Sequence, residues 1–400
     1  MADNTTLGNA KAAKNDEFYT QYHDIEIEIN AYLEYNPELF RGKTVLLPCD
    51  DPEWSNFTKF FAQRFETLGL KKLISTSYAP DAKKAKYGIM PSLFPSEEAA
   101  QQFDKSKWQT HGKIFVLERD VTGDGRIDYQ DIEWNYLEGD GDFRSQEVCK
   151  LRDEADFIIT NPPFSLFREF MAWIMEAGKH FIVIANKNCV TYKEIFPLIM
   201  KNKIWVGKTP MSTDLLFEIP EKMANDFINS SKEGSKYKII NGKVLGRSTS
   251  VWLTNIEHGR RHQPLSLMTM GENLKFSRHK EIKGLKYYLY DNYDAIEVPF
   301  TDAIPSDYEG VMGVPISFLD KYCPEQFEIV GITKTWFGGA NKIYPEQIQV
   351  GKNGKQKRVT KLNDGATLII NNVEDVDTYY IVGDIKYVQV YARILIRKIQ

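Results

Sequence analysis

Short apolar runs alternate with amphipathic helical segments through the first half of the sequence, and this alternation restricts the fold more than any other feature. The expected strands are residues 42–48, 72–77, 113–117, 156–160, 180–185 and 203–207. The expected helices, in which apolar side chains recur at helical spacing, are residues 25–36, 56–68, 165–177 and 192–200. Units of strand, helix and strand connect with right-handed geometry. The pattern therefore predicts an α/β fold with a doubly wound, mainly parallel sheet.

A second domain is expected because the composition and the pattern of expected elements change after residue 220. Residues 237–240 and 251–254 are expected strands, and Asn241-Gly242 is a strong hairpin signal, so we expect this strand pair to finish the first sheet. Further on, the chain is rich in Tyr, Pro and Gly, and strands outnumber helices. The expected parts are a flexible N-terminal arm (1–15), a first domain (16–258) with an insertion at about 79–135, and a second domain (259–400).

Composition excludes several classes of protein. The 400-residue chain is 42% hydrophobic, which is ample for a core, and its formal net charge of -4 gives no overall sign of a nucleic-acid binder. The four cysteines form no CxxC pair, which argues against a zinc site or a disulfide framework and favours a reducing compartment. No apolar run approaches the roughly 18 residues that span a bilayer, and the start has no signal-peptide core. We expect a soluble cytoplasmic protein.

The strand at 156–160 leads directly into Asn161-Pro162-Pro163-Phe164. Ligands bind at the carboxyl ends of strands in open α/β sheets, and prolines hold a turn rigid while removing backbone donors. The side-chain oxygen of Asn161 and the carbonyl of Pro162 can therefore accept hydrogen bonds from one substrate amino group, and Phe164 offers a face for a flat ring. Two such acceptors favour a tetrahedral exocyclic nitrogen, whose lone pair can attack a methyl sulfonium. The alternative is a plain Pro-Pro turn over a buried Phe.

The stretch 120–131 matches the spacing of a calcium-binding loop, with Gly125 at its sixth position. Its oxygen-bearing side chains are Asp120, Thr122, Asp124, Asp128 and Asp131. The context is weaker, because a strand precedes the loop and the last position is Asp in place of Glu. We therefore favour a Gly-rich hairpin turn stabilised by Asp side chains, with Ile127 directed inward. A filled calcium site is the less favoured alternative.

Four motifs follow one another in an informative order. They are Phe18-Tyr19-Thr20, the turn Pro48-Cys49-Asp50-Asp51-Pro52, the stretch 139–145 (Gly-Asp-Gly-Asp-Phe-Arg-Ser) and Asn161-Pro162-Pro163-Phe164. In this order they resemble the motifs of EcoRI-type adenine-specific DNA methyltransferases, and the likeness spans most of the chain. The resemblance implies a Rossmann-like class I methyltransferase sheet followed by a C-terminal, strand-rich α+β target-recognition domain. It also implies S-adenosylmethionine as the cofactor and double-stranded DNA as the substrate.

The resemblance implies roles for residues at the methionine end of the cofactor. Asp50, helped by the backbone around Pro48 and Cys49, would accept hydrogen bonds from the cofactor's ammonium group. The alternative for Asp50 is a cap for the helix that begins at residue 56. The turn has none of the glycines that most methyltransferases carry there, and no acid ends the second strand. Asp51 is therefore a candidate for binding the ribose.

The same resemblance places Asp142 at the adenine end of the cofactor, where it would accept the amino group while Phe143 packs on the ring. The alternative is a turn acid beside a core Phe. Phe18, Tyr19 and Thr20 would close over the methionine end, although aromatic residues before a helix are more often part of a core.

The target adenine would have to leave the duplex, because its amino lone pair cannot be reached within stacked base pairs. Asn161 and Pro162 would then polarise the amine, and Phe164 would stack on the flipped base. A second aromatic usually completes such a sandwich. The candidates for it are Tyr192, Trp205 and Phe217.

Contacts to DNA phosphates are expected from basic side chains placed on one face. The candidates are Lys352, Lys355, Lys357, Arg358 and Lys361, in a run without acids, together with Arg260 and Arg261. A solvated hairpin tip is the alternative for the run. The segment 334–339, which contains Trp336, could form a wedge or contact base edges, although a transition from core to turn is more usual for such a sequence.

Taken together, the sequence predicts a site-specific DNA methyltransferase that acts on adenine N6 and needs no metal for catalysis. We expect a monomer that is either an orphan modification methylase or part of a restriction-modification system with a separate endonuclease. One alternative is the same amino-group chemistry on RNA or on a protein glutamine. Another is a non-catalytic, calcium-regulated DNA-binding module.

Overall fold

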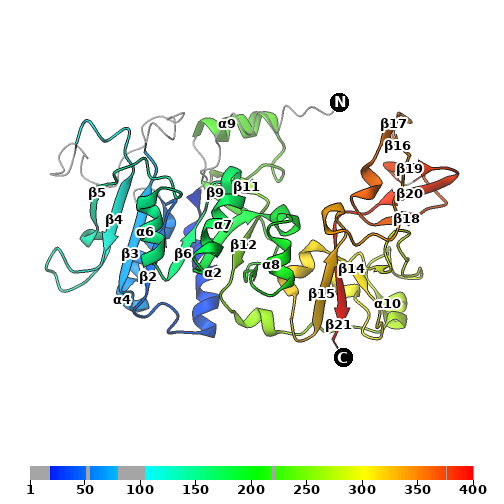
Figure 1. Cartoon of the computed structure of the whole chain (residues 1–400), viewed down its shortest axis with the longest axis horizontal. Coiled ribbons are helices and arrows are strands. Elements are labelled where there is room, and N and C mark those ends of the chain that lie inside the picture. The colour runs from blue at the N-terminus through cyan, green and yellow to red at the C-terminus, as the bar shows by residue number, and fades with distance from the viewer. Residues whose placement is uncertain (1–18, 51–54, 80–103, 219–220, 375, 400) are drawn as a thin grey trace. The chain divides into compact units, whose positions relative to one another are not determined.

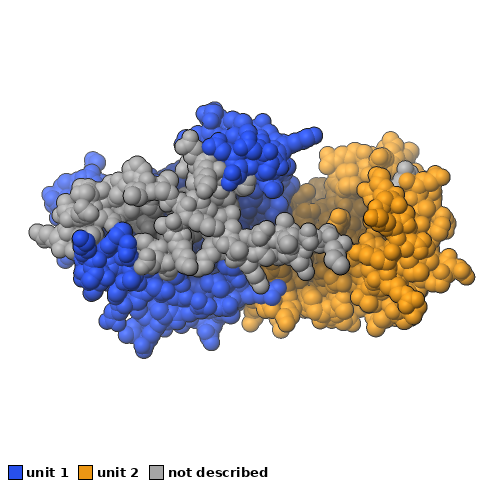
Figure 2. Space-filling view, turned by 90° about the horizontal axis from the view of Figure 1, so that it is seen from above, with its two compact units in different colours: residues 1–187, 206–259 blue, residues 188–205, 260–400 orange. Residues whose placement is uncertain are grey.

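The computed structural model describes residues 19–50, 55–79, 104–218, 221–374 and 376–399. The chain forms two compact units, which Figure 2 shows in different colours. Unit 1 contains Met1–Lys187 and Val206–Gly259, and unit 2 contains Asn188–Trp205 and Arg260–Gln400. The sequence predicted one continuous domain over 16–258, whereas the structure assigns 188–205 to the second unit.

The main sheet is mixed, and its four central strands, β3, β2, β6 and β7, are parallel (Figure 1). The strand order is β5 (Glu133–Tyr136), β4 (Lys113–Leu117), β3 (Lys72–Ser77), β2 (Thr44–Leu47), β6 (Phe157–Thr160), β7 (His180–Asn186), β12 (Ser250–Thr254) and β8 (Trp205–Val206). On one side β4 pairs antiparallel with β3, and on the other β12 pairs antiparallel with β7. The predicted parallel arrangement is therefore confirmed for the central strands, and the flanking strands make the sheet mixed.

Apolar side chains cover both faces of the central strands, as is usual where helices pack on either side. On one face Val45, Phe157 and Ile182 share a core cluster with side chains of α2, α3 and α4. On the other face Leu46 and Ile158 are fully buried, and α6 and α7 lie over the strands in Figure 1. Among its described residues, unit 1 has the helices α2 (Tyr22–Tyr35), α3 (Asn56–Gln63), α4 (Phe65–Leu68), α6 (Gln146–Glu154), α7 (Phe167–Glu176) and α9 (Glu221–Ser230).

A second, antiparallel sheet in unit 1 was not expected. Its order is β1 (Tyr19–Thr20), β9 (Leu215–Glu218), β11 (Lys243–Ser248) and β10 (Tyr237–Ile240). The hairpin at Asn241-Gly242 is confirmed, since both residues have positive φ angles, 51° and 76°, as a tight type I′ turn requires. The expectation that β10 finishes the main sheet is wrong, because β10 pairs with β11 and only β12 joins the main sheet.

A buried carboxylate on α2 accepts hydrogen bonds from the turn after β8. Glu28 accepts hydrogen bonds from the Tyr32 hydroxyl at 2.7 Å and from the backbone N–H groups of Lys208 at 2.8 Å and Thr209 at 2.9 Å. Gly207 leaves room for this carboxylate, because a Cβ there would collide with it. Glu28 is therefore a structural carboxylate of unit 1.

Replacing Glu28 by Ala is expected to lower the free energy of unfolding by about 3 kcal/mol or more, because it leaves several buried donors unpaired. Chemical denaturation measures this loss. Glu34→Ala, at an exposed position on the same helix, is the matched control and should change stability by no more than about 0.5 kcal/mol. Similar losses in the two variants would contradict the role given to Glu28.

Unit 2 is rich in strands and contains one sheet of four strands and one sheet of five strands. The first has the order β13 (Ile296–Glu297), β14 (Met312–Pro315), β21 (Arg393–Lys398) and β15 (Phe327–Ile332). The second, which is antiparallel, has the order β17 (Gln356–Val359), β16 (Gln347–Gly351), β19 (Thr378–Val382), β20 (Ile385–Gln389) and β18 (Thr367–Ile369). The helical elements are η4 (Lys187–Thr191), α8 (Phe196–Met200), η5 (Gly259–His262), α10 (Met270–Phe276), η6 (Thr301–Ala303), η7 (Ile316–Lys321), η8 (Thr335–Phe337) and η9 (Lys361–Asn363).

Aromatic contacts explain why residues 188–205 belong to unit 2. The ring of Phe196 in α8 lies 6.2 Å from that of Trp336 and 5.9 Å from that of Phe337. The guanidinium of Arg261 lies 4.1 Å from the ring centroid of Trp205. Across the described residues, no helix has the length and apolar character needed to cross a membrane.

Candidate active site

The Asn-Pro-Pro-Phe turn lies at the carboxyl end of β6, between that strand and the 3₁₀ helix η3 (Phe164–Leu166) that leads into α7. Asn161 is half-buried and Pro162 is buried. Phe164 is partly buried and packs against the core cluster of unit 1 while keeping some exposure. The turn is thus fixed on both sides by regular structure, and its polar and aromatic groups lie at the edge where α/β sheets bind ligands.

Asp50 lies at the end of the neighbouring strand β2 and is 6% exposed. Its carboxylate accepts a hydrogen bond from the Ser55 hydroxyl at 2.7 Å and another from the Thr160 hydroxyl. Thr160 directly precedes Asn161, so the carboxylate is tied to the residue beside the Asn-Pro-Pro-Phe turn. The alternative role of Asp50 as a helix cap is wrong, because Ser55 caps α3 by accepting from the Phe57 N–H at 3.1 Å.

The N-terminal segment reaches the same region. Thr20 in β1 pairs with Phe217 in β9, and its carbonyl accepts a hydrogen bond from the Asn56 amide at 2.7 Å, at the start of α3. On the other side of the turn, the carbonyl of Pro48 accepts from the Thr76 hydroxyl at 3.0 Å. The structure thereby brings the first and second motifs to the same end of α3.

The structure describes only some of the four other residues predicted to bind the cofactor. Cys49 is half-buried beside Asp50. Phe18 and Asp51 lie outside the described residues, as does the side chain of Tyr19.

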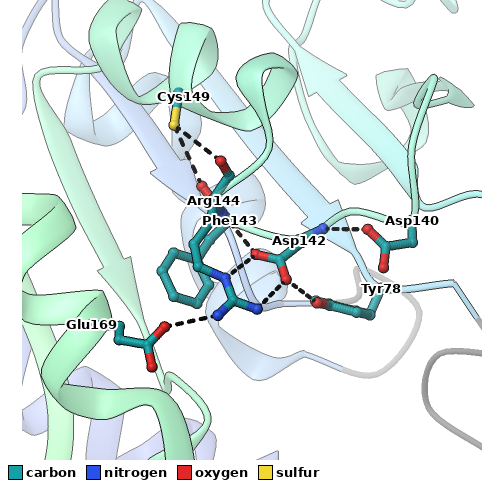
Figure 3. Close-up of polar contacts among 7 residues, drawn as sticks. All are labelled: Tyr78, Asp140, Asp142, Phe143, Arg144, Cys149 and Glu169. Carbon is teal, nitrogen blue, oxygen red and sulfur yellow. Dashed lines mark hydrogen bonds and ion pairs between the residues drawn. The ribbon is translucent and has the colours of Figure 1, made fainter.

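Asp142 follows β5 in the loop that also contains Arg144, and Figure 3 shows the polar contacts around it. Its carboxylate accepts hydrogen bonds from the Arg144 backbone N–H at 2.8 Å, from Arg144 Nε at 2.9 Å and from Arg144 Nη2 at 2.6 Å. The Tyr78 hydroxyl donates a fourth at 2.7 Å. A carboxylate has about four lone-pair sites, so all of them are used.

Arg144 extends this network to the helix that follows the Asn-Pro-Pro-Phe turn. Its Nη1 donates to Glu169, in the first turn of α7, at 2.7 Å (Figure 3). The Arg144 side chain, a backbone N–H and the Tyr78 hydroxyl together lower the pKa of Asp142 to about 2. Burial and the hydrogen bond to Asp142 raise the pKa of Tyr78 above its ordinary value. Asp142 is therefore ionised at neutral pH, and Tyr78 is a neutral donor.

Close backbone packing explains a glycine in the loop. Gly141 has a φ of 85°, and a Cβ on it would lie 2.4 Å from the carbonyl oxygen of Ser77 at the end of β3. Only glycine fits both constraints. This contact holds the Asp142 loop against the carboxyl end of β3.

The predicted aromatic partners are mostly core residues. Phe143 is 1% exposed and packs edge-on against Phe170 and Trp173, with ring centroids 5.1 and 5.6 Å away. It therefore fits the alternative of a core Phe better than a face for the cofactor's adenine. Phe217 is likewise buried in the core cluster of unit 1. Tyr192 is half-buried, and it belongs to unit 2.

The predicted basic residues divide into exposed and buried groups. Lys352, Lys355, Lys357, Arg358 and Lys361 are all exposed, on the hairpin of β16 and β17 and at the start of η9. Arg260 pairs with the buried Asp320 at 3.4 Å. Arg261 is 7% exposed, since it stacks over Trp205 and donates to Asn202 at 3.0 Å. A phosphate contact by Arg261 is therefore corrected to a packing role inside unit 2.

The loop 120–131 is stabilised by its own carboxylates. Asp120 accepts from the N–H groups of Gly123 at 2.6 Å and Gly125 at 2.8 Å. Hydrogen bonds from the backbone N–H groups of Asp128, Thr122 and Val121 lower the pKa of Asp131 to about 2. Among the described residues no group of three or more His, Cys, Asp or Glu side chains could hold a metal ion. The hydrogen bonds accepted by Asp120 fit the favoured turn, and Ile127 packs against the core as expected.

Sequence reasoning missed four residues of this network: Tyr78, Arg144, Thr160 and Glu169. Arg144 stands two positions after Asp142, so its chelation of that carboxylate has a local signal. The hydrogen bond from Arg144 to Glu169, 25 residues further along, has no local signal in the sequence. Thr160 directly precedes the Asn-Pro-Pro-Phe motif, but the sequence does not indicate its partner Asp50, which is 110 residues away.

Comparisons with known proteins find similarity that extends over both units of the chain. A family model described as "Adenine-specific methyltransferase EcoRI" matches residues 6–399. The chain is 41% identical over 336 residues to the type II methyltransferase M.EcoRI of Escherichia coli, covering 83% of this chain and 90% of that protein. It is 33% identical over 329 residues to the type II methyltransferase M.MpnI of Mycoplasma pneumoniae, covering 81% and 84%. No solved structure matches the chain.

Proposed function

The chain belongs to the EcoRI family of adenine-specific methyltransferases, and we propose that it transfers a methyl group from S-adenosylmethionine to N6 of an adenine in a specific duplex DNA sequence. The observation that carries this proposal is the hydrogen bond from Thr160 to Asp50, which ties an acid suited to the cofactor to the residue before Asn161. The mixed sheet with covered faces supports a Rossmann-like class I methyltransferase fold.

The cofactor's methionine end would be held where Asp50, Thr20 and the carbonyls of Pro48 and Cys49 meet. Asp50 is a buried carboxylate next to backbone carbonyl oxygens, a set of acceptors suited to an ammonium group. When bound, S-adenosylmethionine supplies a methyl group on a positively charged sulfur. The residues of this chain then contribute positioning and electrostatics.

The target adenine would be polarised by Asn161 and Pro162. Their two oxygens accept the hydrogens of the amino group, which directs the nitrogen lone pair away from the ring and toward the methyl group. Phe164 keeps some exposure at the turn and would stack on the flipped base. After methyl transfer the nitrogen carries a positive charge and is acidic, so it loses one proton to water. No acid or base is needed to start the reaction.

The adenine end of the cofactor poses a different problem, because all lone pairs of Asp142 are already used. We assign Tyr78 as the donor that the cofactor displaces from Asp142. The three hydrogen bonds from Arg144 should remain, because they come from a residue in the same loop. The cofactor's amino group would replace the Tyr78 hydroxyl. Arg144 would keep Asp142 oriented and linked to α7 through Glu169.

Tyr78→Phe is therefore expected to tighten cofactor binding by roughly two- to tenfold, the worth of one competing hydrogen bond. Calorimetric titration with S-adenosylmethionine measures this change. Tyr22→Phe is the matched control, since it also removes one tyrosine hydrogen bond, to Gln63 at 3.0 Å, and should leave affinity unchanged. Weaker binding by Tyr78→Phe would mean that the hydroxyl contacts the cofactor itself.

Phosphate contacts in DNA would come from Lys355, Lys357, Arg358 and Lys361. Lys352 and Arg260 are weaker candidates because they form ion pairs with Asp377 and Asp320. The exposure and like charge of the first four residues support this assignment. We further propose a monomer without a catalytic metal, located in the cytoplasm and working beside a separate endonuclease. Activity that survives a chelator and sedimentation as a monomer would be the expected results.

Incubation with tritiated cofactor and DNA, followed by digestion to nucleosides, tests the proposed function. Label should appear in N6-methyladenine. Label in 4-methylcytosine, or none in DNA, would reject the adenine assignment. Competition between duplex DNA and RNA distinguishes the proposal from the same chemistry on RNA. Sequencing of modified bases in DNA from cells that express the protein would give the recognition sequence.

A further inference from the structure

Unit 2 displays a large aromatic side chain on a firmly held turn. Trp336 lies in η8 and is 39% exposed. The preceding residues are fixed by Asp364, which pairs with Lys334 Nζ at 2.9 Å and accepts from the Thr335 hydroxyl at 3.1 Å. Gly338, with a φ of 77°, ends the turn. The backbone that carries the indole is therefore held at both ends.

Packing also restricts the indole ring itself. One part of it meets Phe337 and Phe196 edge-on, at centroid distances of 5.9 and 6.2 Å. Phe337 in turn sits against β15, since a Cβ on Gly331 would lie 2.7 Å from its ring. An exposed aromatic held in this way loses little conformational entropy when it binds a partner.

A cavity places the turn that carries Trp336 beside the end of the β16–β17 hairpin. Asp364 directly follows η9, which continues from the β16–β17 hairpin. An open cavity of about 660 Å³ is lined by Thr335 of η8 and by residues 359–361, 363 and 364. Within the described parts of the chain, Lys355, Lys357 and Arg358 make no ion pair that would neutralise them. The turn therefore borders the same cavity as Val359, at the end of β17, and Lys361.

We propose that Trp336 contacts the bases of bound duplex DNA, while the β16–β17 hairpin holds the neighbouring phosphates. This inference rests on the proposed function. Charge complementarity favours DNA over a protein partner, because residues 351–361 contain five basic residues and no acid. Phosphate contacts fix position but carry no sequence information, whereas a rigid indole can pack on base faces or edges.

A salt series separates the two kinds of contact. The probe is a fluorescent duplex containing the site found by sequencing modified bases, and its binding is followed by anisotropy. Trp336→Ala should weaken binding roughly tenfold at every salt concentration, with an unchanged salt slope. The double variant Lys355→Gln, Lys357→Gln should instead reduce the slope of log K against log salt by about 2. Trp336→Phe should keep most of the affinity.

Phe276→Ala is the matched control, because Phe276 is 61% exposed and lies in α10, far from β16 and β17 in Figure 1. It should bind DNA like the unchanged protein. Equal affinity of Trp336→Ala and the unchanged protein would overturn the inference, as would an equal loss in Phe276→Ala. A wild-type protein that binds no DNA would instead reject the proposed function.

Crosslinking tests the contact without any substitution. Ultraviolet irradiation of the wild-type protein with a duplex carrying 5-iodouracil in place of each thymine in turn should attach DNA to Trp336. Mass spectrometry of the digested adduct identifies the residue. Adducts found only at other aromatic residues would contradict the proposal, and protection of Trp336 by a second copy of the chain would assign the surface to self-association.

Discussion

Asn161→Ala is expected to lower kcat by roughly 10²- to 10³-fold, the usual effect of removing one group that stabilises developing charge. The side-chain oxygen would be lost as an acceptor for the target amine, which leaves the nitrogen lone pair delocalised into the ring. The fold should persist, because Pro162, Pro163 and the start of α7 still fix the turn. Single-turnover methylation with saturating cofactor and DNA measures the effect.

Cofactor binding separates chemistry from folding in this experiment. The dissociation constant of S-adenosylmethionine should be unchanged in Asn161→Ala, since Asp50 and Asp142 remain in place. Asn371→Ala, in an exposed turn of unit 2, is the matched control and should keep full activity. Full activity in Asn161→Ala with normal cofactor binding would refute the proposed mechanism.

Asp50→Asn is expected to weaken cofactor binding by roughly 10- to 100-fold, because a hydrogen bond to a charged group contributes about 1.5–3 kcal/mol. Asn has nearly the same size but lacks the negative charge that would pair with the ammonium group. Its amide N–H groups also face two hydroxyl donors, Ser55 and Thr160. Calorimetric titration with the cofactor measures the loss.

Ser55→Ala provides the comparison for Asp50. It removes one hydrogen bond to the carboxylate and the cap of α3, so it should cost about 1 kcal/mol of stability while preserving the charge. Cofactor affinity should fall much less than in Asp50→Asn. Equal losses of affinity would show that the local fold, and not the charge of Asp50, controls binding.

Local signals predicted the parts of the fold that depend on neighbouring residues. The type I′ turn at Asn241-Gly242 is an example, because positive φ angles favour those two residue types wherever they occur. The buried strand before Asn161 is another, since four apolar or β-branched residues in a row suit a strand covered on both faces. In both cases the physical cause lies within a few positions of the residue concerned.

Contacts between distant segments could not be predicted in the same way. β1 is only two residues long and pairs with β9, almost 200 positions later, so no periodic pattern marks it. The burial of Arg261 depends on Trp205, which precedes it by more than 50 residues in the sequence, with strand β12 in between. The hydrogen bond from Thr160 to Asp50 joins residues 110 positions apart, so no local pattern marks it either.

Under the DNA contacts proposed for unit 2, the assignment of residues 188–205 to that unit has a consequence for exchanging sequence specificity between relatives. Unit 2 is made of two separate pieces of chain, and the shorter one supplies Phe196 and Trp205 to its interior. A hybrid enzyme joined at residue 260 alone would leave these two rings facing a foreign surface. A functional transplant should need three junctions, at 187/188, 205/206 and 259/260. Recombination between relatives would therefore yield working hybrids more readily when the two pieces travel together.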